Sequence, residues 1–173
     1  MIPQIGIFAF DNVKIYEGTR ANFQYTVNSS NLEQQFIIPS SHVDTDTLDV
    51  RVQESSSDTT TTTYTLNSDY TTLTSTSTKY FLQEVEDGRF EVYFGDGNIS
   101  KALSDGNIVI LNYVVTNKTA SNGASTFSAP SSIDGVSDIT VTTVVSAGGG
   151  AEPESLASIK LQAPLDYASQ GRA

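Results

Sequence analysis

Three evenly spaced Asp-Gly pairs in the middle of the chain are the first candidates for a functional site. Each pair lies nine residues from the next, and they are Asp87-Gly88, Asp96-Gly97 and Asp105-Gly106. Carboxylates repeated in this way could bind calcium or form a catalytic pair. They could also mark the corners of a sheet, because Asp and Gly both accept the positive φ of a tight turn.

We interpret the pairs as structural turns. Calcium needs about six to eight oxygen ligands around one point. Asp87 and Asp96 stand at the two ends of "RFEVYF", a strand-like stretch that would separate them by roughly 20 Å. Gly88 should close "KYFLQEV" onto "RFEVYF", and the following glycines should turn the chain toward "NIVILNY". These turn residues are Gly95, Gly97 and Gly106. We therefore predict no metal site and no cofactor.

Other candidates for chemistry carry weaker signals. His42 is the single histidine, and no cysteine is present to share a metal with it. The acidic group Asp44, Asp46 and Asp49 falls beside a strand whose solvated face Asp49 should occupy. Gly148 and Gly149 precede a helix but lack the lysine of a phosphate-binding loop, so we expect a structural turn. A carboxylate-pair hydrolase stays open, because the separation of the two groups in space decides it. We predict no enzyme.

Charge and composition narrow the classes of partner. The chain has 173 residues, a net charge of −11 and an isoelectric point of about 4.2. Only 9 residues are Lys or Arg, which is a poor footprint for nucleic acid or an anionic membrane surface. A protein partner with a basic face stays open, because complementary charge would steer that encounter. The lack of cysteine agrees with assembly in a reducing cytoplasm.

Hydrophobic alternation with a period of two runs through most of the chain and predicts strands. The clearest segments are "NFQYTV", "LDVRVQ" and "RFEVYF", and shorter ones are "IGIFAF", "VKIY", "QFII", "TYTL" and "ITVTTVV". "NIVILNYVV" is apolar on both faces and should be a central strand. The Thr-rich stretch 54–80 could be a disordered linker, but its spaced Tyr and Leu favour strands. The fold class is mainly β, a β-sandwich or barrel-like antiparallel domain.

Turn and linker composition divides the predicted organisation. Residues 1–30 should form N-terminal strands that are partly separate, and residues 31–117 the antiparallel β domain. Residues 118–135, rich in Ser, Ala, Asn and Gly, should be a linker. Residues 136–173 would begin a small, incomplete α+β domain of one strand and one helix. Pro153 fits the first turn of that helix and Pro164 should end it.

Two blocks of sequence resemble the baseplate J-like family, which includes wedge subunits of contractile-tailed, T-even-type bacteriophages. The first block runs from Tyr80 to Phe127 and matches the family's E-V-x-D-G, E-V-x-F-G-D-G, G-N-x-V and N-G-A elements. The second block, Ser146 to Ala173, matches its G-G-x-x-x-E-S, I-[KR], A-P and R-A elements. The chain departs from the family at Ser100 and near Lys118, where glycine is common. The matching residues of the first block are Glu84, Val85, Asp87, Gly88, Glu91, Val92, 94–97, Gly106, Asn107, Val109, Tyr113 and 122–124.

The resemblance implies structural work in a virion. Such subunits form part of the wedge arms of a tail baseplate, pair with copies of themselves and help close the ring around the tail hub. It also implies that this chain is a central fragment, because the family sequence usually continues past "R-A". The expected partners are other wedge subunits and a second copy, and assembly would take place in the cytoplasm of the bacterial host. We expect the copies to meet through Leu156, Ile159 and Leu161, which lack a partner layer.

A carbohydrate-binding β-module of a tail or surface protein is the alternative function. The Thr-rich strands and the 8 Tyr and 8 Phe residues favour it, whereas the absence of Trp disfavours it. Such a module would need an exposed aromatic platform. A glycan hydrolase domain of a tail would need two carboxylates facing a cleft.

Overall fold

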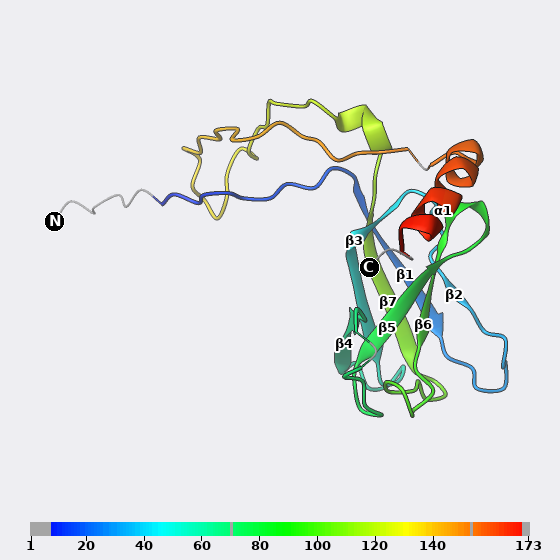
Figure 1. The fold of residues 1–173 in the computed structure, drawn as a ribbon. Coiled ribbons are helices and arrows are strands. Elements are labelled where there is room, and N and C mark those ends of the chain that lie inside the picture. The colour runs from blue at the N-terminus through cyan, green and yellow to red at the C-terminus, as the bar shows by residue number, and fades with distance from the viewer. Residues whose placement is uncertain (1–7, 70, 153, 171–173) are drawn as a thin grey trace.

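The computed structural model describes residues 8–69, 71–152 and 154–170. It contains one seven-stranded sheet in the order β1-β7-β3-β4-β5-β6-β2, which curls into a nearly closed barrel (Figure 1). The strands are β1 (Thr19–Thr26), β2 (Phe36–Ile37), β3 (Val43–Gln53), β4 (Thr61–Leu66), β5 (Lys79–Glu84), β6 (Phe90–Phe94) and β7 (Ile108–Val115). The mainly-β, barrel-like fold expected from the alternating pattern is confirmed.

The barrel is filled by the inward side chains of its strands. Val50, Val92 and Leu111 are completely buried, as expected where successive residues face opposite sides of a sheet. Aromatic rings join them in edge-to-face pairs such as Tyr64 with Phe94, whose centroids lie 5.3 Å apart. The buried core is Phe36, Ile38, Val50, Val52, Tyr64, Tyr80, Val92, Val109, Leu111 and Tyr113.

One strand pair departs from the expected antiparallel arrangement. β4 and β5 run parallel, with Thr65 opposite Lys79 and Leu66 opposite Tyr80. A parallel pair needs a crossover of roughly a dozen residues, and the second half of the Thr-rich stretch supplies it. That stretch is therefore part strand and part turns. Tyr70, one of its expected anchors, lies outside the described residues.

A bulge in β3 accounts for the acidic group near its start. The register with β7 shifts between Asp44 and Asp49. The Thr47 hydroxyl donates to the Asp44 carbonyl at 2.7 Å and accepts from the Val114 N–H at 3.0 Å, so a side chain replaces the missing ladder contact. Asp49 lies on the outer face and pairs with Arg51 at 2.8 Å. These aspartates shape a strand and do not converge on a site.

The N-terminal segment differs from the expectation of partly separate strands over 1–30. β1 pairs with β7 along its whole length, from Thr19–Val115 to Thr26–Ile108, and is an edge strand of the barrel. Residues 8–17, which include the strand-like "VKIY", have no regular structure and run away from the barrel (Figure 1). Alternation alone did not make a strand where no neighbour was available.

The C-terminal region holds a helix but not the expected strand. Residues 137–146 are irregular, because none of the backbone hydrogen bonds in the described region pairs them into a ladder. Helix α1 (Leu156–Gln170) begins after Ser155, whose hydroxyl accepts from the Ser158 N–H at 3.2 Å as an N-cap. Pro164 lies inside the helix and does not end it. Pro153, expected in the first turn, lies outside the described residues.

Candidate assembly surface

The first Asp-Gly pair forms the corner between β5 and β6. A short 3-10 turn, η1 (Glu86–Gly88), joins the two strands, and Asp87 and Gly88 have φ of 62° and 65°. The Val85 N–H donates to the Arg89 carbonyl at 2.8 Å and closes the loop. The Asp87 side chain is exposed and lies 3.8 Å from Arg89. The pair therefore shapes a hairpin, and its carboxylate faces solvent.

The second pair is a corner closed by its own carboxylate. Asp96 Oδ1 accepts from the N–H groups of Asn98 at 2.9 Å and Ile99 at 3.1 Å. Because these backbone donors favour the charged form, they lower the pKa of Asp96 to about 2. Gly97 has φ of 87°. A Cβ on Gly95 would stand 2.0 Å from the Ile99 carbonyl oxygen, so only glycine fits there.

The third pair ties the start of β7 to the end of β1. Asp105 Oδ1 accepts from the Ser29 N–H at 2.8 Å and from the Ser29 hydroxyl at 3.1 Å. Gly106 has φ of 78°, and its N–H donates to the Val27 carbonyl at 2.9 Å. The three pairs thus lie at separate corners, and the carboxylates of Asp96 and Asp105 accept hydrogen bonds there. Across the part of the chain that is described, no group of three or more His, Cys, Asp or Glu residues could hold a metal ion.

Ser100 is a buried polar residue whose role the sequence did not predict. It has φ of 74° and no exposed surface. Its hydroxyl donates to the Ser77 carbonyl at 2.7 Å, and its N–H donates to the Thr74 carbonyl at 3.1 Å. Lys118 also has positive φ, at 56°. The resembling family often has glycine at the position of Ser100 and commonly has one near Lys118, and this departure is the signal that the sequence offers.

The glycine run joins the N-G-A motif at one end of the barrel. The Asn122 amide donates to the Gly150 carbonyl at 2.8 Å and accepts from the Gly150 N–H at 3.0 Å. Gly123 donates to Ala147, and Ala147 donates to Ala124, both at 2.8 Å. A Cβ on Gly150 would lie 2.1 Å from the Lys118 carbonyl oxygen. We call residues 117–124 with 147–152 the junction; it brings the two family-like blocks together.

Charged contacts add the N-terminal segment to this junction. Glu17 accepts hydrogen bonds from the backbone and side-chain amides of Asn117, which begins the turn η2 (Lys118–Ser121). Lys118 pairs with Glu152 at 3.1 Å. The segment that leads into β1 and the segment that follows β7 are therefore both held at the junction. Two of the predicted turn glycines lie here. Gly149 has φ of 90°, and a Cβ added to Gly148 would have no atom within 4 Å.

Beyond the junction the chain presents apolar side chains to solvent. Residues 8–16 and the loop 125–146 extend from the same end of the barrel and run in the same direction (Figure 1). Phe8 is 85% exposed and Val145 is 79% exposed. A large accumulation of exposed apolar side chains makes these segments a candidate surface for protein contact. The exposed apolar residues are Phe8, Phe10, Val13, Ile15, Tyr16, Ile133, Val136, Val141, Val144 and Val145.

Helix α1 also leaves its described apolar residues uncovered. Leu161 is 72% exposed, and Ile159 is exposed as well. The side chain of Leu156, the third expected interface residue, lies outside the described part. Leu165 and Tyr167 extend the exposed apolar set along the helix. None of the helices in the described chain is long and apolar enough to cross a membrane.

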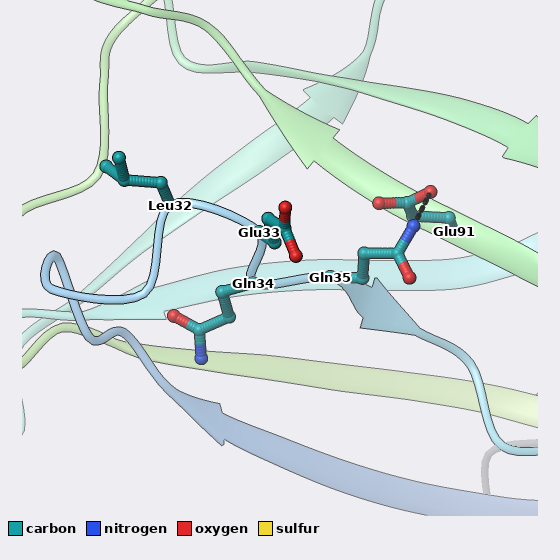
Figure 2. A pocket seen from close by; sticks show the side chains of 5 residues that line it. All are labelled: Leu32, Glu33, Gln34, Gln35 and Glu91. Atoms are coloured by element: carbon teal, nitrogen blue, oxygen red, sulfur yellow. Dashed lines mark hydrogen bonds between the residues drawn. The ribbon is translucent and has the colours of Figure 1, made fainter.

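A hollow lies between the loop before β2 and the outer face of β6. Its volume is about 500 Å³, and it is lined by Leu32, Glu33, Gln34, Gln35 and Glu91. In Figure 2 the Gln35 amide turns toward the Glu91 carboxylate, at 3.4 Å, while Leu32 lies at the other end of the loop. Gln83 donates to the same carboxylate at 3.0 Å. Glu91 is thus held by amides. The lining of the hollow includes a second carboxylate, that of Glu33, but two carboxylates fall short of the three or more ligand residues that a metal site would need, and none of the lining residues is a typical nucleophile.

The sequence of the barrel matches the model of a known protein family. Residues 20–126 match the family model described as bacteriophage baseplate wedge protein gp6, third domain. This segment runs from β1 to just beyond the N-G-A motif. The chain is also similar to baseplate wedge protein gp6 of Enterobacteria phage T4, at 29% identity over 120 aligned residues. The alignment covers 57% of the chain and 18% of the length of that relative.

Proposed function

The chain belongs to the bacteriophage baseplate wedge protein gp6 family through its third domain, and on that basis we propose that it is a structural part of a phage tail baseplate wedge. The family match over 20–126 is the observation that carries the proposal. The chain acts by contact with other proteins. The exposed apolar segments support this role, since they extend from a barrel that is itself well filled.

The site of action is the tail baseplate of the virion, and assembly takes place in the host cytoplasm. A direct test is to insert an epitope tag in the exposed loop 55–58 of the protein as encoded in its phage or prophage, and to locate the tag on virions by immunogold microscopy. Label at the end of the tail supports the proposal. Label on the head or along the tube, or tagged protein absent from purified virions, contradicts it.

Other wedge subunits and a second copy of the chain are the proposed partners. Copies associate through helix α1, where Ile159 and Leu161 are exposed and apolar. The net charge of −11 repels like copies and attracts partners with a basic face. Contacts with other subunits should therefore weaken with added salt, and apolar contacts between copies should not.

Sedimentation measures the helix contact. The intact chain should associate, and a chain ending after Ile133 should not. Leu161→Asp should raise the dissociation constant of the pair by at least about tenfold, because it places a charge in an apolar contact. Leu32→Asp is the matched control, since Leu32 is exposed on the barrel far from the helix in sequence. Equal association in all four proteins would remove the helix from the proposal.

Catalysis is not part of the proposed role. The family and the relative are both described as baseplate wedge proteins. The carboxylates of Asp96 and Asp105 accept hydrogen bonds within turns, and that of Glu91 is held by amides. Neither description supports the carbohydrate-binding alternative. Membership of the wider baseplate J-like family, inferred from the two sequence blocks, remains a proposal that rests on those motifs.

A further inference from the structure

Strand β1 has one open edge. Val27, just after β1, donates to the carbonyl of Asn107, just before β7, and backbone groups on an antiparallel strand face alternate sides. The backbone N–H and carbonyl groups of odd-numbered residues of β1 therefore bond to β7, and those of even-numbered residues point away from β7. The hydrogen bonds on the other side of β7 follow the same alternation. Thr116, an even-numbered residue just after β7, donates its N–H to the carbonyl of His42, just before β3.

Only the C-terminal end of that edge is covered by other residues. The Gln34 amide donates to the Thr26 carbonyl and accepts from the Asn28 N–H, both at 2.8 Å. The Tyr25 hydroxyl bridges to the Ile37 carbonyl at 2.6 Å and brings β2 against this end. The backbone groups of Arg20, Asn22 and Gln24 have no hydrogen-bond partner among the described residues. Three successive outward residues thus offer three N–H donors and three carbonyl acceptors.

An apolar side chain stands beside this edge. Phe23 belongs to the inward set of β1, yet it is 39% exposed because the barrel does not close there. Its ring lies 5.0 Å from that of Tyr25, at the margin of the core. An added strand would therefore gain both ladder hydrogen bonds and an apolar contact. Open edges of this kind are templates for a strand from another chain.

The chain also contains a strand-type segment without a ladder partner. Residues 139–145, "ITVTTVV", are β-branched throughout and carry no charge. The junction fixes the ends of their loop, and the Thr143 hydroxyl donates to the Ser125 carbonyl at 2.7 Å. These contacts hold the loop so that it projects from the barrel rather than along the chain's own β1 (Figure 1).

We propose that residues 139–145 of one copy add as a strand to the β1 edge of a second copy. Exchange in both directions gives a closed two-fold pair, in which each edge is covered once. Ile139, Val141 or Thr143 would then lie against the exposed side of Phe23. This inference rests on the self-association in the proposed function and names a second surface for it, distinct from helix α1.

Disulfide trapping tests the contact directly, because the chain has no native cysteine. Asn22→Cys is combined in one chain with Thr140→Cys, Thr142→Cys or Val144→Cys, which covers the possible registers. Mild oxidation should give a two-chain product for at least one combination. The control pairs Asn22→Cys with Ser57→Cys in an exposed loop. A link within one chain, or cross-linking no faster than in the control, overturns the proposal.

Proline substitutions test the ladder by sedimentation. Thr142→Pro removes a donor from the added strand, and Gln24→Pro removes one from the open edge without breaking a bond to β7. Each should raise the dissociation constant of the pair by about tenfold or more, whereas Ser131→Pro, in the same loop but outside the segment, should leave it unchanged. Thr142→Pro decides the matter if Gln24→Pro impairs folding, because residue 142 lies outside the barrel.

The two interfaces fail independently. If Leu161→Asp abolishes association while Thr142→Pro has no effect, strand addition is wrong and the helix contact stands. If the protein does not associate at any concentration, strand addition is wrong, but localisation on the baseplate still tests the structural role. If the proline variants alone weaken the pair, strand addition is supported and the helix is not the contact.

Discussion

The barrel and the segments that flank it use similar residues with opposite results. Between Thr19 and Val115, alternating apolar side chains meet neighbours on adjacent strands and form a buried core. In residues 8–16 and 125–146, equally apolar and β-branched stretches remain exposed. Alternation therefore supplies one face of a contact, while the second face must come from another strand. In the flanks, that second face is what a partner would provide.

The largest expected effect comes from matched leucines in the two regions. Leu111→Ala should lower the free energy of unfolding by about 2–5 kcal/mol, because it leaves a cavity in the centre of the barrel. Leu161→Ala should change it by less than about 0.5 kcal/mol, since that side chain is 72% exposed. Urea unfolding of both variants measures the contrast. Comparable losses would mean that the helix is packed as tightly as the barrel.

Glycine substitutions sharpen the comparison at the level of the backbone. Gly95→Ala should destabilise the barrel by about 1–3 kcal/mol, because the new Cβ would meet a carbonyl oxygen at 2.0 Å and force the corner to shift. Gly148→Ala should be nearly neutral, since nothing lies within 4 Å of that position. Thermal unfolding of the two variants, run side by side, gives the answer. A neutral Gly95→Ala would show that the corner yields easily.

Ser100 separates backbone strain from hydrogen bonding. Ser100→Ala keeps the positive φ and loses the buried hydroxyl contacts to Ser77 and Lys79, so it should cost about 1–2 kcal/mol. Ser100→Gly loses the same contacts but relieves the backbone, and should be less destabilising than Ser100→Ala by about 1 kcal/mol. Chemical denaturation compares the two. The reverse order would show that the φ of 74° costs little here.

The smallest effect is a dependence of stability on pH that arises in the barrel. Asp96 has a folded pKa of about 2, below its usual 3.8. The stabilisation from its charged form is therefore complete above about pH 4 and is lost as the pH falls through about 2. Asp96→Asn retains an acceptor for the turn but cannot titrate, so its midpoint temperature should fall less steeply between pH 4 and 2.

Two other carboxyls keep part of the pH dependence in that variant. Hydrogen bonds from Thr60 and Thr71 lower the pKa of Asp58 and Asp69, which lie in other barrel loops. The comparison is therefore between slopes, measured by thermal scans of the two proteins in the same buffers. Identical slopes would show that the Asp96 turn is equally formed with and without the charge.

Much of the barrel could be predicted from local sequence. The segments "LDVRVQ", "RFEVYF" and "NIVILNYVV" all form strands, because their period-two pattern matches the pleat. Helix α1 was also expected, although its start is set by Ser155 and Pro164 lies within it. Strands were wrongly expected at residues 13–16 and 137–146. The same pattern is present there, but no neighbouring strand pairs with it.

The proposed interface and the junction were harder to predict. Sequence placed the exposed residues on the helix and the glycines before it, but not Asn122 holding Gly150, nor Glu17 meeting Asn117. These contacts join residues 28 and 100 positions apart along the chain. No local periodicity reports such a distance, although the two family-like blocks marked both partners of the first contact.

Local sequence indicates most of the barrel's strands and corners and which of their side chains face inward, because these follow from alternation and from the φ that Asp and Gly accept. Tertiary structure decided the strand order, the parallel β4–β5 pair, the buried Ser100 and the open edge of β1. These depend on which strands meet across the barrel. Backbone hydrogen bonds do not distinguish one residue from another. Which strand pairs with which is therefore decided only when the whole sheet closes.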